Sequence, residues 1–130
     1  MLTIHDQAVN ADNFVVYLKE LRKKHRKRPI ALFMDRLNVH KANSVKPWYE
    51  KLKITPIFNA RYSPETNPIE AVFSKVKAIF SRKRVNCLVN KIDFYMDSEI
   101  QAAFSSITIE HCAACVRKSL HLLERSAETK

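Results

Sequence analysis

The chain has 130 residues, of which 46% are hydrophobic, and this is enough for one domain with a modest core. Its 23 lysines and arginines outnumber 13 aspartates and glutamates, which gives a formal net charge of +10. This charge favours polyanionic partners, nucleic acid before anionic membranes, although a basic protein can also belong to a large assembly. The sequence contains no glycine, which excludes glycine-rich phosphate loops and leaves tight turns to Asn, Asp and Pro.

The cysteine content and the hydropathy of the sequence indicate in which cellular compartment the protein is expected. Three cysteines and no hydrophobic leader indicate an intracellular reducing compartment without a disulfide framework. No apolar run approaches the length of a membrane-spanning helix, so no membrane span is expected. Cys112 and Cys115 have the spacing of half a zinc site, with His111 beside them, but there is no second pair. Because cysteine also packs as a small hydrophobe on a helix, we favour packing over zinc binding.

The first predicted elements are a short strand and a helix. Met1 to Ile4 is suited to the end of a strand, and Asn10 or Asp12 can cap a helix that runs to about His25. One buried stripe is expected on this helix, formed by Phe14, Leu18 and Leu21.

The end of this helix carries a dense run of positive charge, with Glu20 as its single acid. The run fits a solvated helix end that complements the helix dipole, and it fits equally a contact with nucleic acid or an assembly partner. Its members are Lys19, Arg22, Lys23, Lys24, Arg26, Lys27 and Arg28.

A buried strand is predicted next. Pro29 ends the helix, and the continuous apolar run from Ile30 to Met34 leads to Asp35. Ligands of open α/β sheets bind outside the carboxyl ends of the strands, so Asp35 stands where a site is expected. Its alternative role is a turn or capping carboxylate. After a loop over residues 36–43, a helix capped by Asn43 or Ser44 should contain Pro47 in its first turn and direct Trp48 and Leu52 to the core.

A second strand, Ile54 to Asn59, leads through a loop to another helix. Asn67 suits its N-cap, Pro68 its first position and Glu70 its third, so an Asn-x-x-Glu capping box would explain these residues without catalysis. One face of the helix is apolar, with Ile69, Phe73, Val76 and Phe80. Elsewhere it carries basic residues with no acid among them, and we favour phosphate or assembly contact over simple solvation for Lys75, Lys77, Arg82, Lys83 and Arg84.

The remainder of the chain predicts a helical C-terminus. One helix should run from Asp97 or Ser98 to about Ser105, and a longer one from Thr108 to about Arg125. Apolar residues recur at helical spacing in the longer helix, namely Ile109, Cys112, Val116, Leu120 and Leu123.

Two segments carry a resemblance to a known family. Met34 to His40 and Tyr62 to Glu70 resemble the second and third acidic blocks of the DDE transposases of the mariner-like superfamily. The pattern Tyr-Ser-Pro-x-x-Asn-Pro-Ile-Glu before a basic amphipathic helix is the more specific of the two. The similarity extends from Val9 to the segment around Ser106–Thr108, so it covers nearly the whole chain. The family's first catalytic Asp has no counterpart here, and its usual Asn after the second Asp is replaced by Arg36, whose charge competes with a cation.

The resemblance implies an α/β fold of the ribonuclease-H-like type, here a partial one with a short mixed sheet flanked by helices and a helical C-terminus. We expect a single truncated domain over residues 1–130, with a motif-bearing part over 1–84 and a helical part over 85–130. Asp35 and Glu70 are the implied catalytic metal ligands and should lie together at one sheet edge. His40 and Asn67 are the implied supporting residues, and the implied cofactor is Mg²⁺ or Mn²⁺.

The implied function is DNA strand cleavage and transfer by a two-metal mechanism, if the first Asp is supplied. The alternative is a catalytically silent, transposase-derived subunit with a structural or binding role in a larger complex. DNA is the implied partner, and another protein chain is expected to cover the open sheet edge. A nuclear location follows from the resemblance, while a mitochondrial assembly stays open.

Overall fold

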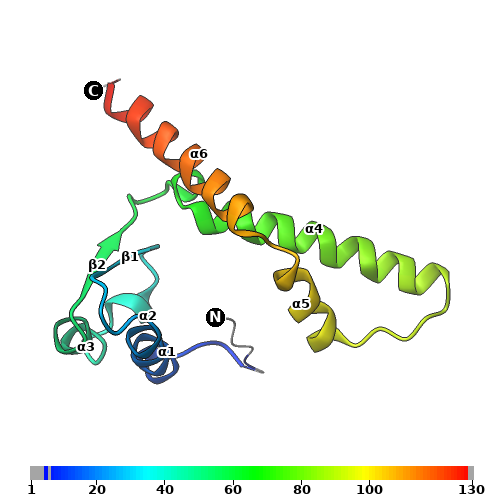
Figure 1. Ribbon diagram of the computed structural model, residues 1–130, viewed down its shortest axis with the longest axis horizontal. Helices are drawn as coiled ribbons and strands as arrows, with labels where there is room; N and C mark the ends of the chain where they lie inside the picture. The colour runs from blue at the N-terminus through cyan, green and yellow to red at the C-terminus, as the bar shows by residue number, and fades with distance from the viewer. Residues whose placement is uncertain (1–4, 6, 129–130) are drawn as a thin grey trace. The chain divides into compact units, whose positions relative to one another are not determined.

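The computed structural model describes residue 5 and residues 7–128 (Figure 1). They form two compact units, one ending at Pro64 and the other beginning at Glu65. The strand predicted at residues 1–4 lies outside the described residues. The described part is mixed α/β, with six α-helices, one 3-10 turn, two strands and a helical C-terminus. The single domain expected over residues 1–130 stays a prediction.

The first unit begins with α1 (Ala11–Lys24), which confirms the predicted helix. Asn10 caps it reciprocally with Asn13, because each backbone N–H donates to the other side-chain oxygen, at 2.9 and 3.2 Å. β1 (Ile30–Met34) and β2 (Ile54–Phe58) follow where the apolar runs predict strands.

The connection between the strands differs from the prediction. The expected loop after Asp35 contains a one-turn helix, α2 (Asn38–Lys41), which is too short for hydrophobic periodicity to reveal. α3 (Lys46–Lys51) follows Val45 and has no side-chain cap, so the caps proposed at Asn43 and Ser44 were wrong. Trp48 and Leu52 pack against the core as expected but stay partly exposed, whereas Tyr49 is buried.

The two described strands are parallel, and Ile30 pairs with Ile54. The mixed sheet stays a prediction. Asn59 N–H donates to the Met34 carbonyl at 2.7 Å. Since alternate residues of a strand turn their backbone groups to the same side, Met34 and Leu32 face β2, and Ala31 and Phe33 face away. By the same alternation the backbone nitrogen of Pro56 faces away from β1. Proline is tolerated there because an outer edge needs no N–H for the β1–β2 ladder.

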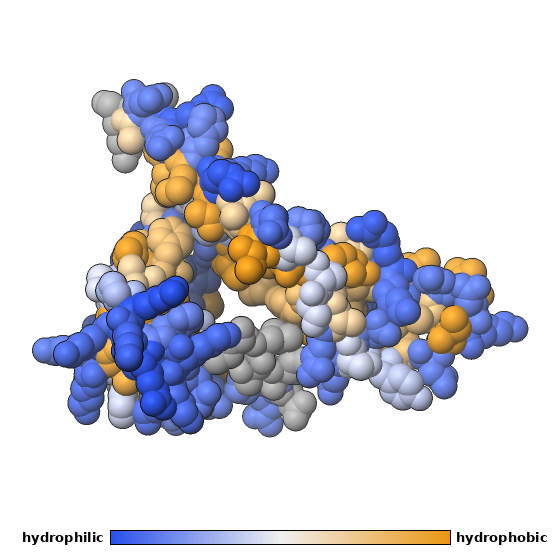
Figure 2. All heavy atoms as spheres, viewed as in Figure 1, coloured by the Kyte–Doolittle hydropathy of each residue, from blue (hydrophilic) through white to orange (hydrophobic). Residues whose placement is uncertain are grey.

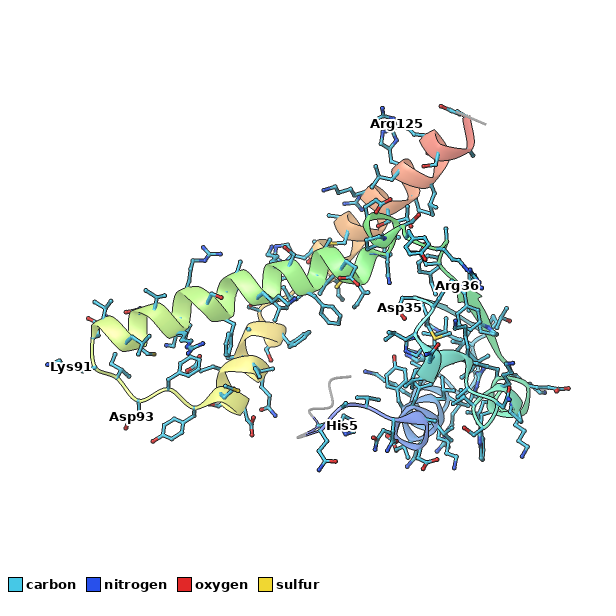
Figure 3. The ribbon with its side chains drawn as sticks, turned by 180° about the vertical axis from the view of Figure 1, so that it is seen from behind. His5, Asp35, Arg36, Lys91, Asp93 and Arg125 are labelled. Atoms are coloured by element: carbon cyan, nitrogen blue, oxygen red, sulfur yellow. The ribbon has the colours of Figure 1, made fainter. Side chains whose placement is uncertain are left out.

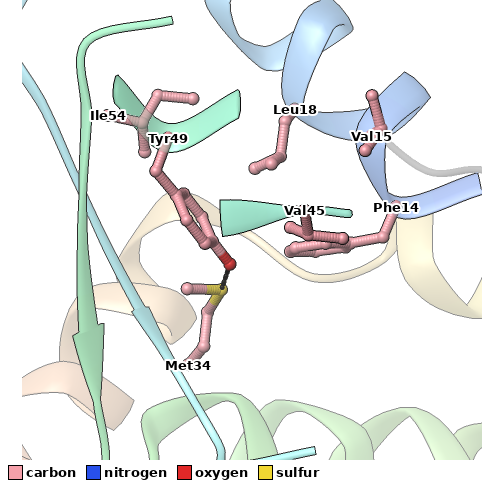
Figure 4. Close-up of a cluster of buried hydrophobic side chains, with 7 residues drawn as sticks. All are labelled: Phe14, Val15, Leu18, Met34, Val45, Tyr49 and Ile54. Atoms are coloured by element: carbon pink, nitrogen blue, oxygen red, sulfur yellow. Dashed lines mark hydrogen bonds between the residues drawn. The ribbon is translucent and has the colours of Figure 1, made fainter. Parts of the chain in front are cut away.

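The core of this unit lies between α1, α3 and the two strands (Figure 4). Leu18 and Val45 are fully buried at its centre, and the Tyr49 hydroxyl reaches the Met34 sulfur at 3.7 Å. The buried members are Phe14, Val15, Leu18, Met34, Val45, Tyr49 and Ile54. This packing fixes the carboxyl end of β1, from which Asp35 follows.

The second unit is helical. A 3-10 turn (Pro64–Thr66) precedes α4 (Pro68–Val89), which packs against α5 (Met96–Ser105) and α6 (Ile109–Glu128). Phe73 meets Phe104 edge to face with ring centroids 6.3 Å apart. The division that was predicted after residue 84 lies within α4, whose regular structure continues for another turn. No described helix combines the length and the apolarity that crossing a bilayer requires.

The apolar stripe of α6 is largely exposed. Ile109 is 84% exposed, whereas the buried residue of this helix is Ser119, on a neighbouring face. Figure 2 shows apolar residues on the surface along α4 and α6. The periodicity thus located the helix, but it did not identify the side that packs.

The turns of this glycine-free chain also differ from expectation. Among the described residues, left-handed backbone angles occur at Lys53, Tyr62 and Lys91, with φ of 51°, 56° and 54°. Asn and Asp, two of the residues expected in tight turns, tolerate this conformation best, yet neither occupies these three positions.

Candidate active site

Asp35 follows β1 directly, with Arg36 beside it (Figure 3). The backbone N–H of Leu37 donates to Asp35 Oδ1 at 3.1 Å, and His40 Nδ1 lies 2.9 Å from the same oxygen. No described residue donates to Oδ2, and the side chain is 41% exposed. One carboxylate oxygen is therefore fixed by the protein while the other is open to a ligand.

His40 is held from three sides. α2 brings its ring back to Asp35, and the Phe14 ring of α1 packs against it at a centroid distance of 4.6 Å. The Tyr49 hydroxyl donates to the His40 backbone carbonyl at 2.8 Å. Burial raises the pKa of that phenol, so it stays a hydrogen-bond donor at neutral pH. Nothing in the sequence signalled the contacts from Phe14 and Tyr49, which lie 26 and 9 positions from His40.

Glu70 stands in the first turn of α4, as predicted, but it does not complete a capping box. Asn67 caps the helix by accepting from Ile69 N–H at 3.3 Å, and Pro68 opens it. Within the described chain the Glu70 carboxylate has no hydrogen bond, and the residue is exposed. Capping thus accounts for Asn67 and Pro68 and leaves Glu70 available for another role.

The two acids belong to different units, Asp35 to the first and Glu70 to the second. Their expected proximity therefore stays a prediction. In the part of the chain that is described, no group of three or more His, Cys, Asp or Glu side chains is placed to hold a metal ion. Asp35 Oδ2 and the Glu70 carboxylate suit a hard cation chemically, since both are carboxylate oxygens without a competing donor.

The loop after β2 is tied to the strand ends by Asn59, which is buried. Its side chain donates to the Ser63 carbonyl at 2.7 Å and accepts from Ala60 N–H at 2.9 Å. Like Asp35, Asn59 is the first polar residue after a parallel strand, and this position is the signal that could have identified it. The family-like segment beginning at Tyr62 thus starts from a fixed anchor.

The basic residues of α4 are all exposed and available for contact. Together we call Lys75, Lys77, Arg82, Lys83 and Arg84 the α4 basic set, whose members lie on different sides of the helix. In the described chain, the one contact found between a carboxylate and a basic side chain is that of Asp35 with His40, so no described carboxylate neutralises these charges. Figure 2 shows a further gathering of hydrophilic residues over α1 and α3.

Arg22 must be removed from the predicted contact run. Its Nε donates to the Leu52 carbonyl at 2.6 Å, and Nη1 donates to the Arg28 carbonyl at 2.9 Å. Nη1 and Nη2 also donate to the carbonyls of His25 and Lys53. The guanidinium therefore joins the end of α1 to the turn before β2 and is not free for a phosphate.

Among the described residues, the cysteines form no metal-binding group with their neighbours. His111 Nδ1 accepts from Thr108 N–H at 3.2 Å, and Thr108 Oγ1 accepts from His111 N–H at the same distance, so the pair caps α6. Cys112 and Cys115 are free thiols on that helix. Cys112 is exposed and Cys115 is partly exposed, so the preference for packing over zinc binding stays a prediction.

These features define an α/β domain whose parallel strands end at an exposed carboxylate. The sequence matches the family of DDE superfamily endonucleases over residues 1–90, and the chain belongs to that family. Membership implies a ribonuclease-H-like fold and supports a nuclease or transposase-like function that typically uses divalent metal ions. A search of curated proteins found no match to the chain. The mariner-like assignment stays a prediction.

Proposed function

We propose that the chain supplies two of the three carboxylates of a DNA-cleaving and strand-transferring DDE site. The observation that supports this most directly is the difference between the two oxygens of Asp35: Leu37 and His40 hold Oδ1, whereas no described residue donates to Oδ2. The Leu37 bond alone is an Asx-turn, which a structural carboxylate also makes, so it is the open Oδ2 that favours a ligand role. Asp35 and Glu70 would hold divalent metal, which supplies activation of the attacking oxygen and stabilisation of the leaving oxygen.

The residues around Asp35 have positioning roles in this proposal. His40 orients the carboxylate through Oδ1 and is itself fixed by Phe14 and Tyr49. Asn67 fixes the start of α4 and thereby the backbone at Glu70. Neither residue needs to touch the metal, since each acts through the ligand beside it.

Paramagnetic Mn²⁺ tests whether both acids bind one metal site. In NMR spectra of the chain, Mn²⁺ should broaden the amide signals of Asp35 and Glu70 at the same low concentration. Glu70→Gln should remove the effect at residue 70 and weaken it at Asp35, while Glu128→Gln serves as a matched control. Broadening at one acid alone, or equal broadening around Glu128, would contradict a shared site.

The α4 basic set is proposed to contact DNA phosphates. It begins on the same helix as Glu70, and no ion pair neutralises it in the described chain. Replacing Lys75, Lys77, Arg82 and Lys83 with Gln should lower the salt slope of duplex binding by about 0.9 per lost contact. An unchanged slope would indicate that these side chains are only solvated and do not contact phosphate. Weakened assembly without any DNA binding would instead favour a protein partner.

A catalytically silent subunit is the second candidate, and Arg36 favours it. Its exposed guanidinium directly follows Asp35, so its charge opposes a cation at Oδ2. Arg36→Asn should strengthen Mn²⁺ broadening at Asp35 if the site still binds metal. No broadening in either the original chain or this variant would favour the silent role.

A protein partner is proposed for the outer edge of β1. Ala31 and Phe33 turn their backbone groups away from β2. β1 contains no charged residue and no proline that would prevent another strand from pairing with this edge. β2, in contrast, has Pro56 on its outer side. The occupant that these alternating donors and acceptors fit is an extended strand of another chain.

A further inference from the structure

Tyr62 combines two features that surface residues seldom share. Its φ of 56° lies in the left-handed region, which disfavours a bulky side chain, and its side chain is 97% exposed. The other described positions with such angles are the lysines 53 and 91, whose charged ends belong in water. An aromatic ring in solvent gains no burial that would offset its strained backbone, so packing within the described chain does not explain Tyr62.

The loop that carries Tyr62 is organised. Asn59 binds the Ser63 carbonyl at 2.7 Å and is itself joined to β1 through the Met34 carbonyl. The Ser63 hydroxyl donates to the Arg61 carbonyl at 3.2 Å. These bonds close the loop on both sides of Tyr62, so the ring is presented from a fixed backbone.

The location of this loop connects it with Asp35. Because β1 and β2 are parallel, Asp35 and Asn59 follow their strands at the same edge of the sheet. Arg61, which is exposed, precedes Tyr62 directly. An exposed aromatic ring and an exposed arginine on one loop can together bind an unpaired nucleotide, the ring by stacking on the base and the cation by contacting the phosphate.

We infer that Tyr62 is a stacking platform for an unpaired nucleobase of a DNA strand bound at the carboxyl edge of the sheet. The inference rests on the proposed function, since it takes DNA as the substrate. Stacking needs no particular base, so Tyr62 acts as a positioning residue for a strand end and does not read its sequence.

Fluorescence anisotropy in EDTA tests the inference without metal chemistry. Labelled duplexes with and without a single-stranded tail are titrated with the chain at several salt concentrations. Tyr62→Ala should weaken binding of the tailed duplex by about 5- to 150-fold, the range expected for one lost base stack. Tyr62→Phe should retain the affinity. The salt slope should stay constant in both variants, because the phenol carries no charge, whereas Arg61→Gln should lower it by about 0.7 to 0.9.

A stability measurement separates stacking from a structural role. Tyr62→Gly should raise the urea midpoint, because glycine adopts φ of 56° without strain, and should still weaken binding of the tailed duplex. A structural role would instead lower both. Tyr95→Ala is the matched control, since Tyr95 is 69% exposed in the other unit, and it should change neither quantity.

Three outcomes would overturn the inference. The first is unchanged affinity of Tyr62→Ala for the tailed duplex. The second is equal weakening for the blunt duplex, which would exclude an unpaired base. The third is the absence of wild-type binding to both DNAs, which would also overturn the proposed function and is thereby distinguishable from the first two.

Discussion

Asp35 and Glu70 illustrate how little of a carboxylate's role is set by its position in the sequence. Both acids stand where the motif pattern placed them, one after a strand and one in the first turn of a helix. Their hydrogen bonds could not be predicted, because they depend on His40 folding back through α2 and on Asn67 capping α4 without help from Glu70. In both cases acceptor oxygens have no donor among the described residues.

Tyr49 stabilises the candidate site through the hydrogen bond from its hydroxyl to the His40 carbonyl, and removing this hydroxyl tests that contribution. Tyr49→Phe should lower the free energy of unfolding by about 0.5–1.5 kcal/mol, because the His40 carbonyl loses its donor. Tyr17→Phe is the matched control, since burial raises the pKa of both phenols but the Tyr17 hydroxyl has no hydrogen bond in the described chain. Urea denaturation measures both, and equal losses would show that the bond contributes nothing specific.

The same phenol predicts an alkaline limit of stability. Burial raises the pKa of Tyr49 above its usual 10.0, so the unfolded chain loses this proton at a lower pH than the folded chain. The resulting stability is complete below pH 10 and is lost as the pH rises through the folded-state pKa. Tyr49→Phe should therefore flatten the fall of the urea midpoint above pH 10, and an unchanged fall would assign it to other groups.

At the scale of the elements, the sequence predicted best where local signals and tertiary packing agree. α1, β1, β2 and the start of α4 have caps, prolines or apolar runs that mark them, and each was located to within about a residue. The end of α4 was missed because no proline or cap interrupts it after Arg84. The packed face of α6 was missed because a small polar residue, Ser119, lies against its neighbour while larger apolar residues stay exposed.

Arg22 shows how an element can depend on a contact that no local pattern reveals. Its guanidinium joins the end of α1 to carbonyls 30 and 31 positions away. Arg22→Lys should lower the free energy of unfolding by about 1–3 kcal/mol, since an ammonium cannot reproduce the planar array of donors. Lys23→Gln, one residue on, should change it by less than about 0.5 kcal/mol. A loss as large in the control as in Arg22→Lys would contradict this role.

The outer edge of β1 provides a test that spares the fold. Ala31 N–H points away from β2, so Ala31→Pro should leave the urea midpoint nearly unchanged while abolishing strand addition by a partner chain. Leu32→Pro is the contrasting variant, because its N–H belongs to the β1–β2 ladder, and it should unfold the unit. Analytical ultracentrifugation with the partner chain measures the addition. Undiminished association of Ala31→Pro would assign the interface to another surface.

For the whole molecule, the number of available carboxylates sets the expected activity. Two acids can hold one metal loosely, but paired metals in line with a phosphodiester need a bridging ligand as well. We therefore expect the 130-residue chain alone to be inactive in Mg²⁺- or Mn²⁺-dependent nicking of supercoiled plasmid DNA. Robust nicking that Glu70→Gln abolishes would contradict this expectation and establish the chain as a self-sufficient enzyme.

α4 has a mechanical consequence for such an assembly. Its 22 residues contain no glycine, and its one proline is in the first turn, so the helix is a stiff rod about 33 Å long. Glu70 stands at one end, and the exposed Leu88 and Val89 stand at the other. A partner that fixes the C-terminal end of α4 therefore also fixes the direction of its N-terminal end. A partner that binds the exposed Leu88 and Val89 would thus orient the Glu70 carboxylate without contacting the DNA.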